Sequence, residues 1–143
     1  MQNRIIIIGQ TPSHKNSKRM FIARNTGKFF PANNDKYLVW KDAAIVAIKN
    51  SHVKFTEPVA LAVTFFMGDR RSRDLDNMLA SVQDALVSAG AIIDDDDHFL
   101  PMVFAKSGGY DPANPRVEIT FFRVAWNRDM QDWSVDKSIT DWI

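Results

Sequence analysis

The sequence of 143 residues contains no cysteine. Disulfide bonds and thiolate metal sites are therefore excluded, and the composition is compatible with a reducing cytosol. Long hydrophobic runs are also missing, since the opening MQNRIIIIGQ has only four consecutive apolar residues. Such a run is too short for a secretory signal, and no stretch approaches the length of a membrane span. We therefore expect a soluble cytoplasmic protein with no membrane partner.

Acidic residues are absent from residues 1–28, which carry six lysines and arginines. The net charge of +1 conceals this basic segment, because four consecutive aspartates at 94–97 and an acidic tail at 125–143 balance it. Such charge separation suits a protein that holds a polyanion near a metal ion. It also fits a solvated surface with unevenly distributed charge.

Hydrophobic residues make up 45% of the chain and charged residues 24%. One domain with a real core is expected from this composition. Residues 4–8 predict a β-branched strand that Gly9 ends. Apolar residues at helical spacing predict a helix from about residue 35 to residue 50, and period-two alternation predicts a strand over 59–66.

The second half of the chain predicts another helix and two more strands. Apolar positions from Asn77 to Ala89 fit one helical stripe, and Gly90 is a suitable stop. Residues 99–106 and 116–124 predict strands joined by a turn-rich segment. The whole pattern is that of an α+β protein.

The tail, residues 125–143, carries Trp126, Trp133 and Trp142 among polar residues. We expect it to be an extension that packs back onto the domain or meets a partner. The predicted division is therefore a domain over 1–124 followed by this extension.

Two aspartates, Asp74 and Asp76, stand two residues apart in the segment RDLDN. Residues with this spacing point to the same side of an extended chain. Two close carboxylates repel each other, so the arrangement needs a cation. Mg²⁺ fits, because it prefers hard oxygen ligands and keeps waters that a phosphate can displace. The alternative is that Asp76 caps the following helix while Asp74 pairs with an arginine.

Asp95 is the candidate for a third carboxylate. A helix over 77–89 carries the chain about 20 Å away from Asp76, and five extended residues return about 17 Å. Asp95 therefore meets the pair if residues 91–95 run antiparallel to the helix, and a dimer partner supplies it otherwise. Carboxylates that hold Mg²⁺ beside a basic surface are typical of metal-dependent phosphodiester hydrolysis.

The four aspartates at 94–97 do not form a calcium-binding EF-hand loop. Such a loop would need glycine at Phe99 and glutamate at Ala105. A lone histidine beside acids is more often structural than catalytic, so we assign His98 no role.

The segment DRRSRDLDNMLASVQDALVSAGAIIDDD, residues 69–96, resembles the core motif of the RusA family of Holliday junction resolvases. The likeness lies in the basic D-L-D-N segment, the helix with D-A-L, and the glycine and D-D pair that follow. It is specific over about thirty residues and loose over most of the chain. The resemblance implies that Asp74, Asp76 and Asp95 are the essential catalytic and metal-binding carboxylates, and that Asn77 matches the family asparagine.

The resemblance also implies a fold and an activity. A RusA-like fold is a small single domain with a mixed β-sheet of about four to five strands and two main helices. Family members are homodimeric endonucleases that use Mg²⁺, with Mn²⁺ as a substitute, and many are carried by phages and prophages. They bind four-way DNA junctions and nick two opposing strands in DNA recombination and repair. The expected location is the cytoplasm of a bacterial or phage-infected cell.

This sequence departs from the family pattern at Ala80 and Asp97. The family typically has a lysine at the first position, where a helix would place it above the metal site to neutralise developing charge. Arg73, Lys106 or a lysine of the N-terminal segment could substitute for it. Asp97 replaces the family's usual glutamine and adds negative charge.

Six basic residues are candidates for contacts to DNA phosphates, which give salt-dependent affinity for any sequence. They are Lys15, Lys18, Arg19, Arg70, Arg71 and Arg73. Each could instead be an ordinary solvated or ion-paired residue. A two-fold dimer would match the symmetry of a junction.

Two other functions are compatible with parts of the pattern. One is a junction-binding or architectural protein whose chemistry the alanine at position 80 has weakened or abolished. The other is a nucleotide-sugar transferase with Asp74-Leu75-Asp76 as its D-x-D metal motif. The chain is short for such a transferase and lacks a nucleotide-binding β-α-β pattern.

Overall fold

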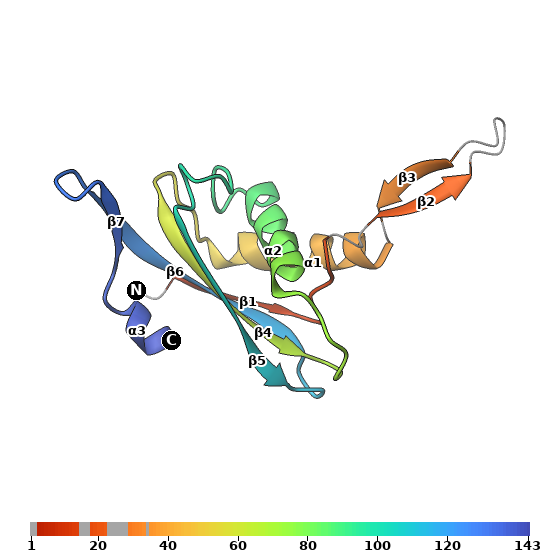
Figure 1. Ribbon diagram of the computed structural model, residues 1–143. Coiled ribbons are helices and arrows are strands. Elements are labelled where there is room, and N and C mark those ends of the chain that lie inside the picture. The colour runs from red at the N-terminus through yellow and green to blue at the C-terminus, as the bar shows by residue number, and fades with distance from the viewer. Residues whose placement is uncertain (1–2, 15–17, 23–28, 34) are drawn as a thin grey trace.

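The computed structural model describes residues 3–14, 18–22, 29–33 and 35–143. The described part of the chain contains seven strands and three helices (Figure 1). They are β1 (Arg4–Ile8), β2 (Lys18–Ile22), β3 (Phe29–Asn33), α1 (Asp35–Ser51), β4 (Val59–Met67), α2 (Leu75–Ser88), β5 (Met102–Tyr110), β6 (Arg116–Asn127), β7 (Asp132–Val135) and α3 (Ile139–Trp142).

The main sheet has five strands, in the order β1-β6-β4-β5, with β7 also paired to β6. β4 and β5 are parallel, whereas the other pairs of this sheet are antiparallel. The predicted α+β fold with a mixed sheet and two main helices is therefore confirmed.

The two main helices cover one face of this sheet (Figure 1). Tyr37, Trp40, Ala44 and Ile48 are all buried, as their helical spacing predicts. β4 is buried on both faces from Val59 to Phe65. Its alternate side chains, with those of β1 and β6, form the core under α1 and α2.

α2 connects the two parallel strands, so β4, α2 and β5 form a β-α-β unit that the sequence patterns did not predict. β5 begins opposite Ala60, at the start of β4. α2 must therefore run back along β4, beginning beside the end of that strand and ending beside its start. The turn into α2 carries aspartates and arginines in place of the glycines of a dinucleotide-binding turn.

A separate two-stranded sheet, β2 with β3, forms an antiparallel hairpin that extends away from the main body (Figure 1). The sequence patterns assigned no strand to residues 18–33. Its short strands follow Pro, Ser and Asn residues, which indicate a loop rather than a strand.

The tail folds back onto the domain. β6 continues without a break through residue 124 to Asn127, and β7 pairs with it. The rings of Trp126 and Trp133 meet edge to face, with centroids 5.4 Å apart. Trp142 of α3 lies 6.1 Å from Phe104 of β5, ring to ring.

Within the described parts of the chain, none of the helices has the length and hydrophobicity to cross a membrane.

The packing of Phe66 generates a stability prediction. The β4–β5 register shifts after Phe65, and the ring of Phe66 lies between the guanidinium of Arg116, 3.8 Å from the ring centroid, and the backbone of Gly108. A Cβ at Gly108 would lie 2.5 Å from the Phe66 ring. We expect Gly108→Ala to lower the free energy of unfolding by about 1–3 kcal/mol through overpacking, measured by urea denaturation.

The matched control is the same substitution in a Phe66→Leu background, where a smaller side chain leaves room for the new methyl group. The loss in that background should be clearly smaller. An equal loss in both backgrounds would mean that Phe66 is not the source of the clash.

Candidate active site

The two motif carboxylates lie at the start of α2. Asp74 occupies the N-cap position with extended backbone (φ −81°, ψ 123°), and Asp76 lies in the first turn. The helix begins two residues before the predicted Asn77, so Asp76 is not the cap. The Asp74 side chain makes no capping hydrogen bond, and it has no ion pair with any arginine side chain that the structure describes. Neither part of the alternative interpretation is therefore found.

Asn77 contacts both carboxylates. Its side-chain Nδ2 donates to Asp74 Oδ2 at 3.1 Å, and its backbone N–H donates to Asp76 Oδ1 at 3.0 Å. Both aspartates are exposed, so their remaining oxygen lone pairs face solvent. The positive end of the helix dipole favours these anions at this position. The arrangement is a pair of oriented carboxylates that can accept a hard cation.

A charged loop leads into this pair. Arg73 donates to both oxygens of Asp69, at 2.8 and 2.9 Å, and the backbone N–H of Arg71 donates to the same carboxylate at 2.9 Å. The Arg73 guanidinium is the main cause that lowers the pKa of Asp69 well below its usual value. The Arg73 side chain is only 16% exposed. It therefore shapes the loop directly before Asp74.

The other two arginines of this loop point outward. The Arg71 side chain is 82% exposed, and its guanidinium lies 3.3 Å from Asp69 Oδ2. The guanidinium of Arg70 lies 4.6 Å from the ring centroid of Tyr110. Both residues are close to Asp74 in the sequence, and both place a positive charge at the surface. Their contact with DNA phosphates stays a prediction.

The N-terminal basic candidates are only partly described. Lys15 lies outside the described residues. Lys18 and Arg19 belong to β2, and their side chains lie outside the described part of the structure.

Asp95 lies at the opposite end of α2 from Asp74 and Asp76. Residues 91–93 bend instead of forming the predicted extended run. The Ala91 carbonyl accepts a hydrogen bond from Phe55 N–H at 2.8 Å, which holds this segment beside the start of β4. The 14 residues of α2 span about 21 Å. One chain therefore does not bring the three carboxylates together.

The exposed loop around Asp95 is crowded with negative charge. Asp95 N–H donates to Asp94 Oδ1 at 2.8 Å. Partial burial raises the pKa of Asp95, and the neighbouring Asp94 and Asp96 carboxylates raise it further. A nearby cation would relieve this repulsion.

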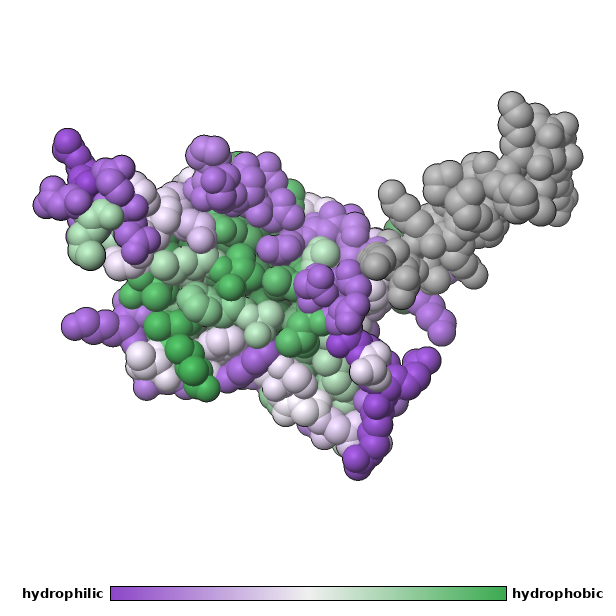
Figure 2. All heavy atoms as spheres, in the orientation of Figure 1, coloured by the Kyte–Doolittle hydropathy of each residue, from purple (hydrophilic) through white to green (hydrophobic). Residues whose placement is uncertain are grey.

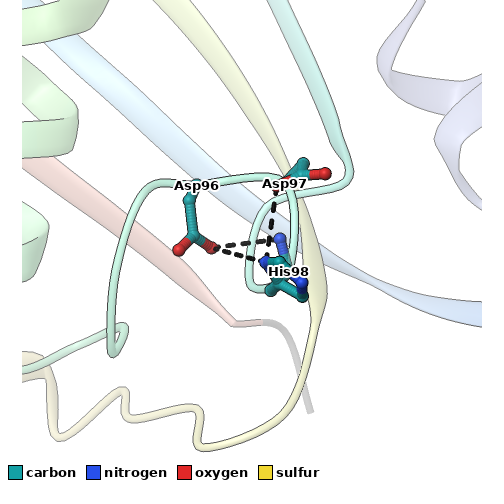
Figure 3. A group of neighbouring side chains, drawn as sticks. All are labelled: Asp96, Asp97 and His98. Atoms are coloured by element: carbon teal, nitrogen blue, oxygen red, sulfur yellow. Dashed lines mark hydrogen bonds and ion pairs between the residues drawn. The ribbon is translucent and has the colours of Figure 1, made fainter.

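The structure brings the side chains of Asp96, Asp97 and His98 close together (Figure 3). Within the described residues, these three form the acidic or histidine group whose ligand atoms all lie within 4.8 Å of one another. His98 Nδ1 lies 3.4 Å from Asp97 Oδ1. Asp96 Oδ1 also accepts the backbone N–H groups of His98 and Phe99. This turn geometry accounts for the grouping, so we keep His98 without a role.

The candidates to replace the missing lysine lie elsewhere. Lys106 pairs with Thr64 on the sheet face opposite α2. Its ammonium lies 4.4 Å from the ring centroid of Trp142 and donates to the Trp142 carbonyl. Arg73 is paired with Asp69. Ala80 itself is half-buried one turn after Asp76.

The sequence patterns did not identify the loop acid Asp69, and they identified Asn77 without its contacts to the two carboxylates. The spacing of Asp69 and Arg73 by four residues was a signal for the ion pair. The bridging role of Asn77 depends on where the helix begins, and the apolar pattern placed that start two residues too late.

Comparison with known proteins is consistent with this geometry. The family model described as Endodeoxyribonuclease RusA matches residues 11–121. The matched range contains the loop, α2 and the acidic segment after it. No curated protein matches the chain.

The Asp69–Arg73 pair predicts a pH effect. The pKa of Asp69 is lower in the folded protein than in the unfolded chain, so the pair stabilises the fold above the unfolded value near 3.9. This stabilisation is lost as the pH falls through the lowered folded pKa. We expect Arg73→Ala to raise the Asp69 pKa, as measured by NMR titration of its carboxyl carbon.

The matched control is Arg70→Ala, since Arg70 contacts Tyr110. Its Asp69 titration should equal that of the wild type. If Asp69 titrates at the same pH with and without Arg73, the ion pair is absent in solution.

Proposed function

Because the chain belongs to the RusA family of endodeoxyribonucleases, we propose that it is a Mg²⁺-dependent enzyme that resolves four-way DNA junctions by paired nicks. The observation that carries the proposal is the oriented carboxylate pair of Asp74 and Asp76 beside outward arginines. The expected setting is DNA recombination and repair in a bacterial or phage-infected cell.

Each active site in this proposal is shared between two copies of the chain. α2 separates one half of the ligand set, Asp74 and Asp76, from the other half, Asp95. If two copies pack with their α2 helices antiparallel across a two-fold axis, each Asp74–Asp76 pair faces the partner's Asp95. A closed two-fold dimer then contains two complete sites. Sharing of this kind explains why residues 91–95 need not return along their own helix.

The surface around α2 supports such a dimer. Figure 2 shows hydrophobic residues gathered over α2 and the sheet beside it. Val103 pairs with the core residue Leu61, so its side chain lies on the α2 side of the sheet, and it is 36% exposed. Ile93, just after α2, is 52% exposed. α2 contains no lysine or arginine, so no cationic repulsion opposes the approach of a second α2.

The donor set fits a magnesium ion. Three carboxylates offer only hard oxygen atoms, which Mg²⁺ prefers, and their mutual repulsion favours binding of a cation. When bound, Mg²⁺ activates water and stabilises charge on the phosphate. Mn²⁺ is expected to substitute for it.

The protein groups have separate tasks. Asn77 orients Asp74 and Asp76, while the Asp69–Arg73 pair holds the preceding loop in shape. Arg70 and Arg71, together with Lys15, Lys18 and Arg19 of the basic segment, are proposed to contact phosphates and provide affinity that does not depend on sequence. Two sites related by the dimer axis would cut two opposing strands.

One observation favours a second candidate, a junction-binding protein with weakened or no catalysis. Ala80 stands where the family typically has a lysine, and Lys106 lies on the far face of the sheet. Without that cation, developing charge on the phosphate has less stabilisation. Binding of junctions without Mg²⁺-dependent nicks would support this candidate.

The carboxylate assignment predicts the effect of Asp76→Asn. This variant should lose cleavage of a labelled four-way junction in Mg²⁺, by at least about 100-fold, because a metal ligand is removed. It should bind the junction as tightly as the wild type or more tightly, because negative charge near the phosphates decreases. Gel analysis of nicked strands and a mobility-shift assay measure the two effects.

Asp42→Asn, which removes an exposed acid from α1, is the matched control and should cut normally. An Asp76→Asn protein that cuts at the wild-type rate would refute the metal assignment.

The shared site predicts complementation between two inactive variants. A mixed dimer of Asp76→Asn and Asp95→Asn chains has one site with both substitutions and one site with neither. Mixing the two inactive proteins should therefore restore single nicks, because half of the mixed dimer is intact. Denaturing gels distinguish single from paired nicks.

If each chain instead built its own complete site, both sites of the mixed dimer would carry one substitution. The mixture would then remain inactive, and the sharing of Asp95 would be ruled out.

A further inference from the structure

The segment before the basic hairpin lies along one face of α2. His14 N–H donates to the Asn77 carbonyl at 3.0 Å, and the Ser81 hydroxyl donates to the Pro12 carbonyl at 2.6 Å. One turn further, Asp84 Oδ2 lies 4.0 Å from His14 Nε2. Residues 77, 81 and 84 share a helix face, so the segment is hydrogen-bonded to this face at Asn77 and Ser81 and lies beside Asp84.

Asp84 joins this segment to α1 as well. Lys41 Nζ lies 2.8 Å from Asp84 Oδ2, and the Tyr37 hydroxyl donates to the same oxygen. The His14 ring packs edge-on against the Tyr37 ring, with centroids 5.3 Å apart. Asp84 is therefore the point at which α1, α2 and the N-terminal segment meet.

The protonation states of Asp84 and Tyr37 favour the hydrogen bond between them. Burial raises the pKa of Asp84, but hydrogen bonds from Lys41 and Tyr37 outweigh it and lower that pKa, so the carboxylate stays ionised. Burial, followed by the hydrogen bond to Asp84, raises the pKa of Tyr37. The phenol therefore remains a donor.

The contacts of this segment continue to the candidate ligands. Asn77 accepts from His14 through its carbonyl, and it donates to Asp74 and Asp76 through its side chain and N–H. The chain that follows His14 leads to β2, which contains Lys18 and Arg19. A displacement of His14 would therefore affect both Asn77 and the position of the hairpin.

We propose that Asp84 is a positioning residue, which holds His14 against α2 and so sets where the β2–β3 hairpin leaves the domain relative to Asp74 and Asp76. This inference rests on the proposed junction-cutting function. Without the anchor, the hairpin still meets DNA phosphates, because its charges are unchanged. The scissile phosphate is then held less accurately against the carboxylates.

The test is the Asp84→Ala variant on a labelled four-way junction with Mg²⁺. At saturating junction, the cleavage rate should fall by about tenfold or more, since misplacement of about 1 Å can cost up to about 100-fold. The nicks should also spread to neighbouring phosphates, while junction affinity stays near that of the wild type. Asp84→Glu, which keeps the carboxylate, should restore the wild-type nick position.

Two further proteins guard against a folding artefact. Asp84→Asn keeps the shape of the side chain and should show the same spread of nicks to a smaller degree. Asp42→Ala removes an exposed acid from α1 and should cut at the wild-type position and rate. In the DNA-free protein, the His14 amide should exchange its hydrogen faster in Asp84→Ala than in the wild type.

The outcomes separate this inference from the proposed function. If the wild type cuts junctions and Asp84→Ala cuts them at the same phosphates, the inference is overturned while the function stands. A slower rate at unchanged positions also overturns it, because that result indicates loss of packing only. If the wild type does not cut at all, the His14 exchange rate still decides: an unchanged rate overturns the anchor, and a faster rate supports it.

Discussion

The length and rigidity of α2 determine where every candidate ligand lies. Two carboxylates at its first turn, oriented by Asn77, repel each other and favour a cation. The third, Asp95, follows the end of the same helix. Parallel pairing of β4 and β5 requires a crossover, so α2 must run from the end of β4 to the start of β5 and leaves Asp95 at the opposite end from the pair. Either a second copy completes the site or the chain has two incomplete halves.

The fold was largely predictable where one periodicity governs a segment. The spacing of Tyr37, Trp40, Ala44 and Ile48 identified both the existence and the buried face of α1, since burial selects one helical stripe. The β4–α2–β5 crossover was not predictable, because alternation says which face is buried but not which strand is the neighbour. The β2–β3 hairpin was missed because Pro, Ser and Asn precede β2 and because β3 contains Pro31 and Asn33, all of which are turn signals.

The sequence identified which residue types could form the site, but it did not predict how they are arranged in space. The D-x-D spacing and the later aspartates identified candidate ligands, but the return of residues 91–95 was inferred from reach alone. Five extended residues are long enough to return to Asp76, but sufficient length does not mean that the chain takes this path. A hydrogen bond from Phe55 holds Ala91 at the far end of α2 instead. Likewise, sequence could not show that both Arg71 and Arg73 contact Asp69, with the Arg73 side chain largely buried and the Arg71 side chain exposed.

The most direct test of the shared site is a crystal of the protein grown with Mn²⁺, in which anomalous scattering locates the ion. The account predicts a peak bonded to Asp74 and Asp76 of one copy and to the partner's Asp95, repeated across a two-fold axis. A peak held by Asp96, Asp97 and His98 alone, or one with all its carboxylate ligands from a single chain, would contradict it.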